Sequence, residues 1–334
     1  MTQPNPQGLH HVTAIAGDPQ RNLDFYHGVL GLRLVKQTVN FDAPDTYHLY
    51  FGDEVGSPGS IMTFFPAPGA PSGRHGAGQA TTTGFSVPST ALGWWDERLR
   101  RLGVEVLARE ERGDEDVLAL SDPDGLRLEL VADARGDTRT PWEAGPVPAE
   151  VAIRGLSHVT LTEHHRDRTA AHLTEQLGFR VDAEHGHRTR FVTGQGAVGQ
   201  RVDVLARPDA PRGLVAAGTV HHIAWRAPER ATQERWRAAL AESGVDLTPI
   251  VDRQYFTSIY FREPGGVLFE IATDTPGFAT DEVVAELGRE LRLPPWLEPQ
   301  RERIAASLPA LALPGDPGDH APASAGVPSA EGPR

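Results

Sequence analysis

Residues 8–18 read GLHHVTAIAGD, a short apolar strand pattern that contains two adjacent histidines, His10 and His11. Residues 218–228 read GTVHHIAWRAP and repeat the double histidine far along the chain. The return of one pattern at a distant position indicates that the chain is built from repeated structural units. Further copies of the same unit are therefore expected between these two segments.

Four segments share one plan: a short strand, a helix that ends at glycine, and further strands that end in an apolar run. In the first segment, Asp18 and Pro19 are typical of an N-cap and a first helical position, and Gly31 is typical of the residue after a helix. We predict four units of this kind. They occupy residues 1–70, 80–135, 151–209 and 216–275, with a linker at 136–150.

The chain beyond the fourth unit changes in character. Two short helical patterns separated by prolines predict C-terminal helices within residues 276–312. Residues 313–334 are rich in Pro, Gly, Ala and Ser, and such a composition has too few apolar side chains to form a core. We predict a disordered tail there.

The composition of the 334 residues argues against several classes of protein. The net charge of −13 argues against a nucleic-acid partner, because phosphate binding needs a basic surface. The absence of cysteine removes disulfides, thiolate ligands and cysteine nucleophiles. No apolar run is long enough to span a bilayer, and the amino terminus lacks the regions of a secretory signal. We expect a cytoplasmic protein without a membrane partner, in which pairing of edge strands would give a homo-oligomer.

The second and fourth units also share a turn and a carboxylate. DPDGLRLE at residues 122–129 and EPGGVLFE at residues 263–270 both place Glu six residues after Pro. Turn chemistry accounts for the proline and glycine, but not for a carboxylate in an otherwise apolar strand. The strands that hold His222 and Glu270 can lie side by side in a small curved sheet. One further histidine would complete two imidazoles and one carboxylate, a set that suits non-heme Fe(II) and also Mn(II).

The residues alone leave the third ligand open. Successive side chains of a strand point to opposite faces, so only one histidine of each pair can enter a shared site directly. His11 is one candidate. His158, in the segment GLSHVTL, occupies the same repeat position in the third unit and is another. A set from the first two units, His11 with Glu129, offers only two ligands.

The four-unit βαβββ plan resembles the vicinal oxygen chelate superfamily, which includes glyoxalase I, fosfomycin-resistance enzymes and extradiol ring-cleaving dioxygenases. Within it the chain is most similar to the hydroquinone-type ring-cleaving dioxygenases, over nearly its whole length and including LPPWLEPQRERI at residues 293–304. The resemblance implies an α+β fold, in which four βαβββ modules form two cup-like mixed sheets with helices outside.

The resemblance also implies a ligand set and a group of catalytic residues. The metal ligands implied are the second histidine of each double-histidine motif and the last-strand glutamate, here His11, His222 and Glu270. Ordinary extradiol dioxygenases draw their ligands from the last two units, which would select His158; the doubled histidine favours His11, since a serine precedes His158. The catalytic residues implied are His10, Thr13, His221, Arg253 and Tyr260.

The activity implied is Fe(II)-dependent, O2-consuming cleavage of a hydroquinone or a related dihydroxylated aromatic ring, with Mn(II) as the other suitable metal. A histidine beside the metal can take or relay a phenol proton, and Arg253 and Tyr260 can donate hydrogen bonds to negative charge on oxygen. Three alternatives stay open. They are a catechol-type dioxygenase that uses His158, a glyoxalase-like isomerase or lyase that needs no O2, and a metal-free protein that binds an aromatic compound or an antibiotic.

Overall fold

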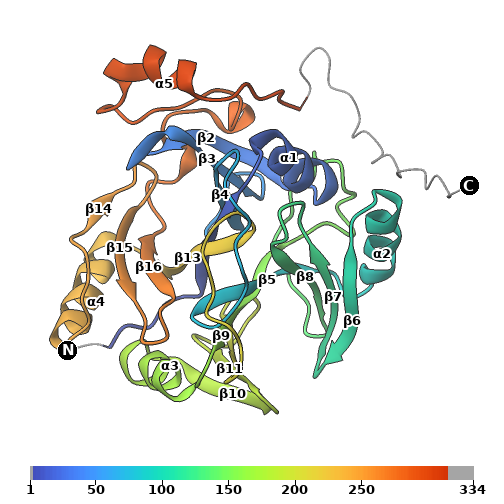
Figure 1. The fold of residues 1–334 in the computed structure, drawn as a ribbon, viewed down its shortest axis with the longest axis vertical. Helices are drawn as coiled ribbons and strands as arrows, with labels where there is room; N and C mark the ends of the chain where they lie inside the picture. Colours follow the sequence, from blue (N-terminus) through green and yellow to red (C-terminus); the bar gives the residue numbers. More distant parts are fainter. Residues whose placement is uncertain (1–2, 315–334) are drawn as a thin grey trace, which may run out of the picture.

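The computed structural model describes residues 3–314. Within them the chain forms two mixed sheets of eight strands each (Figure 1). The first sheet has the order β14 (Val251–Asp252), β15 (Thr257–Arg262), β16 (Leu268–Thr273), β13 (Thr219–Ala227), β1 (Leu9–Ala16), β4 (Ile61–Pro66), β3 (Ala43–Gly52) and β2 (Arg33–Asn40). The second has the order β10 (Arg180–His185), β11 (Arg188–Val192), β12 (Arg201–Ala206), β9 (Gly155–Glu163), β5 (Gln79–Val87), β8 (Arg127–Asp133), β7 (Glu115–Ser121) and β6 (Val106–Arg112).

These orders confirm the expected α+β fold of two cup-like sheets. The first sheet joins the first unit to the fourth, because β1 runs antiparallel to β13 at its centre. The second sheet joins the second unit to the third through antiparallel β5 and β9. Units that are distant in sequence therefore share one sheet, which is the pairing expected if the first unit supplies a ligand to the site of the fourth.

The helices are few and short. Asp18 caps the first helix by accepting the Arg21 N–H at 2.8 Å, and Gly31 follows that helix with a φ of +71°, as expected. None of the helices in the described part of the chain is both long and apolar enough to cross a membrane. The helical elements are α1 (Pro19–Leu23) with the π-helix η1 (Asp24–Val29), α2 (Leu92–Arg101), α3 (Asp167–Ala171) with the π-helix η2 (His172–Gln176), α4 (Arg230–Glu242) and α5 (Arg301–Ser307).

Each sheet has one face under helices and one concave face. On β1, Val12 and Ala14 belong to the apolar core that also buries Trp236 and Leu240 of α4. His11 and Thr13 alternate with them and so point to the other face. Figure 1 shows α2 and α4 on the outside of the second and first sheets. The polar residues of the strand pattern are thereby gathered on the concave side.

The acidic residues that open the two shared turns connect the two sheets. Asp122 of the second unit accepts a hydrogen bond at 3.1 Å from the Tyr26 hydroxyl of the first unit. Glu263 of the fourth unit accepts one at 2.7 Å from the Thr169 hydroxyl of the third unit. The two turns therefore do more than reverse the chain, because each acid binds the helix of a unit in the opposite sheet.

The C-terminal segment differs from the prediction of helices over 276–312. Only α5 is an α-helix, and the other helical pieces are the 3₁₀ turns η3 (Phe278–Thr280), η4 (Val284–Glu286) and η5 (Glu298–Gln300). Contacts with β2 override helix propensity here. Gly288, with a φ of +79°, lies against the Leu34 backbone, and Leu291 forms a β-bridge with Gln37. The predicted tail, from its third residue on, lies outside the described residues.

Lys36 of β2 anchors this segment from the inside. Its side chain is fully buried and binds Asp281 at 2.6 Å as well as the buried Glu282. Removing one partner of a buried ion pair leaves an uncompensated charge.

We expect Lys36→Met to lower the free energy of unfolding by about 3 kcal/mol in urea denaturation. Arg100→Gln, which breaks an exposed pair with Asp96, is the control and should change it by less than about 0.5 kcal/mol; equal losses would contradict this role of Lys36.

A second buried carboxylate lies where the two sheets meet. Glu163, at the end of β9, is 3% exposed, and a Cβ on Gly265 would lie 2.3 Å from its carboxyl carbon. Burial, together with the neighbouring Glu263, raises the pKa of Glu163 from 4.5 to about 8. The folded protein therefore keeps this proton over a pH range in which the unfolded chain has lost it.

This difference predicts a pH dependence of stability. Between pH 4.5 and about 8 the folded state binds more protons than the unfolded state at Glu163, so the free energy of unfolding should fall as pH rises. Glu163→Gln removes the titrating group and should flatten the slope in urea denaturation measured across this range. An unchanged slope in the variant would show that Glu163 is ionised in the folded protein at neutral pH.

Candidate metal centre

Three buried side chains meet at the centre of the first sheet. His11 comes from β1, His222 from β13 and Glu270 from β16. Glu270 Oε2 lies 3.3 Å from His11 Nε2 and 2.9 Å from His222 Nε2. One ligand atom from each residue falls within 4.8 Å of the others, and within residues 3–314 this is the one group of three or more such side chains arranged in this way.

Both double histidines are β-bulges. Across the β1–β13 pair, Leu9 faces Trp225 and His11 faces Ala224, so His10 is an extra residue on β1. Further along the pair the register shifts again, which makes His221 the extra residue on β13. A bulge re-aims a side chain by breaking strict alternation. The bulges explain why the histidines occur in adjacent pairs. In each pair the second histidine, His11 or His222, has a partner across the strands, and the first, His10 or His221, is the extra residue of the bulge.

The bulges bring adjacent imidazoles into hydrogen-bonding contact. His10 Nδ1 lies 2.8 Å from His11 Nδ1, and His221 Nδ1 lies 2.7 Å from His222 Nδ1. A bond between two ring nitrogens holds one proton. If His11 and His222 donate it, their Nε2 lone pairs face Glu270, and His10 carries its proton on Nε2. His10 Nε2 does face an acceptor, the Thr273 carbonyl at 3.1 Å.

Burial governs the electrostatics of His10, His221 and His222. Burial, followed by repulsion from the adjacent histidine, lowers the pKa of both His10 and His221 to about 3. Burial also lowers the pKa of His222, although Glu270 opposes this. For Glu270 burial raises the pKa, and positive charge or donated protons on His11 and His222 would lower it well below 4.5. In the tautomers above, a bound cation would take this part.

Glu270 provides the test of whether a metal fits. Its Oε1 accepts a hydrogen bond from the Ser258 hydroxyl. Its Oε2 is buried and receives no hydrogen bond, although it lies between two imidazole nitrogens. In these tautomers three acceptor atoms converge with no proton between them. They are His11 Nε2, His222 Nε2 and Glu270 Oε2. A divalent cation bound by these atoms would compensate the buried negative charge, so the residues fit a metal ion.

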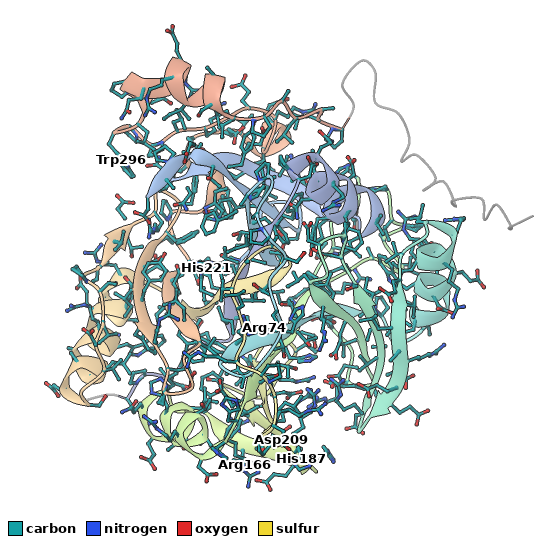
Figure 2. The ribbon with its side chains drawn as sticks, viewed as in Figure 1. Arg74, Arg166, His187, Asp209, His221 and Trp296 are labelled. Atoms are coloured by element: carbon teal, nitrogen blue, oxygen red, sulfur yellow. The ribbon has the colours of Figure 1, made fainter. Side chains whose placement is uncertain are left out.

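The other predicted catalytic residues divide into two groups. His221, Arg253 and Tyr260 line the same cavity as the candidate ligands, a space of about 330 Å³. His221, labelled in Figure 2, lies on β13 of the first sheet. His10 does not line this cavity but a separate one, and Thr13 is fully buried. These last two therefore lie behind the cavity, where His10 contacts His11.

Arg253 closes one side of the cavity. Its Nε donates to the Tyr260 hydroxyl at 3.1 Å, and its Nη1 donates to Asp42 at 3.0 Å, so it links the β14–β15 region to the turn between β2 and β3. Burial and the nearby Glu270 raise the pKa of Tyr260, which keeps its hydroxyl protonated. Tyr260 also faces Glu270 across β15 and β16, and this pairing could be anticipated only once the two strands were known to be neighbours.

The sequence interpretation missed several residues of this cavity. They are the aromatic side chains Phe41, Phe65 and Phe256, the rim residue Asp42, the pair His48 and Tyr50 on β3, and Ser258 behind Glu270. His48 and Tyr50 are two residues apart in a strand, a spacing that places both on one face. That signal was present in the sequence. The sequence did not show which face they share, because that depends on sheet packing.

Most of the chain matches a known protein superfamily. The model of the Glyoxalase/Bleomycin resistance protein/Dioxygenase superfamily matches residues 8–130 and 155–271. The chain belongs to this superfamily. The expected membership is thus confirmed.

Several relatives within the superfamily span most of the chain. A Bacillus subtilis protein named "Putative ring-cleaving dioxygenase MhqO" is 47% identical over 301 residues, covering 90% of this chain and 95% of the relative. The chlorohydroquinone/hydroquinone 1,2-dioxygenase of Sphingobium indicum is 34% identical over 310 residues, covering 90% and 96%. A crystal structure titled as a "putative dioxygenase" from Bacillus subtilis matches with a TM-score of 0.88 at 45% identity, covering 92% of this chain and 98% of that one.

A more distant structure shows the fold alone. Glyoxalase I from Zea mays aligns with a TM-score of 0.57 at 16% identity, over 80% of this chain and 92% of its own. The two-cup architecture is therefore shared with a protein of little sequence similarity.

The second cup of this superfamily member contains a related but different cluster. His158 Nε2 lies 3.1 Å from Glu129 Oε2, as His11 Nε2 lies 3.3 Å from Glu270 Oε2 in the first cup. The β5–β9 register has the same two shifts, and Thr82 stands where His222 stands in the first sheet. Arg112 contacts both Glu129 oxygens at 3.0 Å. A guanidinium thus supplies the positive charge there.

This arrangement corrects two of the alternative ligand sets. His158 cannot join His222 and Glu270, because the third unit pairs with the second and not with the fourth. Glu129 cannot join His11 for the same reason, since it lies in the second sheet with His158. The catechol-type reading that depended on His158 as a ligand is therefore wrong for this chain.

Metal analysis of two matched variants tests the assignment. We expect protein loaded anaerobically with Fe(II) and then desalted to hold one equivalent of metal. His11→Ala should lose it, because one of three ligands is gone. His158→Ala removes a histidine at the same repeat position and should retain the metal. Retention by the first variant together with loss by the second would move the site to the second cup.

Proposed function

We propose that this chain is a metal-dependent ring-cleaving dioxygenase, which opens hydroquinone or a related dihydroxylated aromatic ring with O2. The observation that carries the proposal is the buried meeting of His11, His222 and Glu270 around an oxygen that receives no hydrogen bond. Relatives named as ring-cleaving dioxygenases support it over nearly the full length of the chain, and one is named for chlorohydroquinone and hydroquinone.

The proposed ligands are His11, His222 and Glu270. Two imidazoles and one carboxylate on one face leave open positions and suit Fe(II), with Mn(II) as an alternative. When bound, such a metal supplies the Lewis acidity that favours a phenolate and the redox capacity that O2 chemistry requires. The one ionised ligand leaves the centre with a net positive charge, which favours an anionic ring oxygen.

The cavity suits a single aromatic ring. Its volume is about 330 Å³, and Phe41, Phe65 and Phe256 contribute flat apolar walls against which a ring can pack. Its polar groups are few and are placed around the candidate ligands, an arrangement typical of small-molecule sites. A ring that fills it would exclude most of the water from the ligands.

Each remaining residue of the site has a defined part in the proposal. His221 accepts from His222 at Nδ1, so its proton is on Nε2 and can be donated to a substrate oxygen in the cavity. Arg253 and Tyr260 donate to negative charge that develops on oxygen. His10 holds the His11 ring in the tautomer that ligates. Thr13 bonds Thr63 at 3.0 Å and supports the cavity wall from behind.

O2 uptake tests the proposal directly. Anaerobically Fe(II)-loaded protein is mixed with oxygenated hydroquinone and, in parallel, with catechol. We expect equal amounts of O2 and hydroquinone to be consumed, with hydroquinone preferred. His11→Ala should be inactive and His158→Ala active. Absence of uptake with any dihydroxybenzene would contradict the proposal and would favour an isomerase or a binding protein instead.

Two further expectations concern the protein's surroundings. A cytoplasmic location and a homo-oligomeric assembly stay predictions from the sequence.

A further inference from the structure

The first and fourth units place related residues on opposite sides of the proposed metal centre. Their strand orders mirror each other outward from the central pair, β1-β4-β3 on one side and β13-β16-β15 on the other. Tyr260 faces Glu270 across one pair of strands, and Tyr50 faces Thr63 across the matching pair. Tyr50 is therefore the counterpart of Tyr260, on the wall of the cavity away from the carboxylate.

The residue two positions earlier in each strand completes the correspondence. Ser258 donates a hydrogen bond to Glu270 on one side. On the other side, His48 takes the place of the serine and contacts Thr63 at 2.7 Å. His48 and Tyr50 both line the cavity, yet the roles proposed above use neither.

Four side chains on this wall form one chain of hydrogen bonds. Thr13 and Thr63 are joined at 3.0 Å, Thr63 and His48 Nε2 at 2.7 Å, and His48 Nδ1 and the Tyr50 hydroxyl at 2.9 Å. Burial lowers the pKa of His48 well below 6.5 and raises the pKa of Tyr50 well above 10, so both groups are neutral.

Counting protons in this chain shows what Tyr50 can do. Three hydroxyls and one neutral imidazole carry four protons, and the three hydrogen bonds use three of them. The fourth is free at one end. In one direction of donation, from Tyr50 toward Thr13, the Tyr50 hydroxyl donates to His48 and can accept a hydrogen bond from a bound molecule. With the bonds reversed, it accepts from His48 and can donate. Tyr50 can therefore contact either a hydroxyl or a carbonyl-like oxygen.

The distance across the sheet matches a ring with oxygens at opposite ends. Only β4 separates β1, which holds His11, from β3, which holds Tyr50, so the two strands are roughly 10 Å apart. A single ring with one oxygen at the metal and another at the far end extends across this space. A ring with adjacent hydroxyls directs both toward the metal and leaves Tyr50 without a partner.

We propose that Tyr50 binds the substrate oxygen farther from the metal, and that His48 positions the Tyr50 hydroxyl for this contact. The inference rests on the proposed function and adds to it a residue that selects para-diols over ortho-diols. Arg253 is a less suitable partner for this oxygen, because its guanidinium already donates hydrogen bonds to Tyr260 and Asp42.

Anaerobic calorimetry tests the contact without turnover. Fe(II)-loaded protein is titrated with hydroquinone and with 4-methylphenol, which lacks the second oxygen. Tyr50→Phe should raise the Kd of hydroquinone about tenfold, the loss expected for one hydrogen bond, and change the Kd of 4-methylphenol less than about twofold. Tyr47→Phe is the matched control on the same strand. Its hydroxyl bonds the Pro309 carbonyl outside the cavity, and neither Kd should change.

A second variant tests the part of His48. His48→Asn should weaken hydroquinone binding in the same direction by a smaller factor, with 4-methylphenol unaffected, since the Tyr50 hydroxyl remains but is no longer positioned. A purely structural role of His48 would weaken both ligands alike. Metal content, measured for each variant, should equal that of the unmodified protein.

The outcomes separate this inference from the proposed function. Equal losses for both ligands in Tyr50→Phe, or no loss for either, would overturn the inference while O2 uptake with hydroquinone upholds the dioxygenase. An unmodified protein that neither binds hydroquinone nor consumes O2 with it would overturn both.

Discussion

The buried carboxylate of Glu270 is the constraint on which the arrangement of the site depends. An ionised group in the core is costly unless charge or hydrogen bonds compensate it, and here only one of its oxygens receives a hydrogen bond. The other lies between His11 and His222. The bulged neighbours fix the ring orientation of these imidazoles. A metal ion is the natural counterpart of such a set, and the double histidines are the means of forming it from two separate units.

The second cup shows the same constraint met in another way. Glu129 is buried beside His158, as Glu270 is beside His11, but Thr82 occupies the place of His222. Arg112 binds both oxygens of Glu129. Burial would raise the pKa of Glu129, and its contacts with His158 and Arg112 outweigh that effect and lower it. One repeated architecture thus holds a candidate metal centre in one cup and an ion-pair cluster in the other.

Contacts between distant units hold the two cups in position and also set local structure. The acids of the two shared turns bind helices of the opposite sheet, through Tyr26 in one case and Thr169 in the other. Along β2, the C-terminal segment follows Lys36 and Gln37 instead of coiling into the helix that its sequence favours. In both places tertiary contacts decide between conformations that differ little in local preference.

The sequence by itself determined the repeated unit, the helix cap at Asp18, the turn after Gly31 and the types of residue at the candidate centre, because these follow from periodicity, backbone preference and ligand chemistry within short segments. Only the tertiary structure decided that the first unit pairs with the fourth, which excludes His158 from the site. It also decided that His48 and Tyr50 face the cavity and that Arg112 reaches Glu129. The pairing of the first unit with the fourth depends on strand edges that meet across more than two hundred residues of chain, and no local pattern encodes that choice.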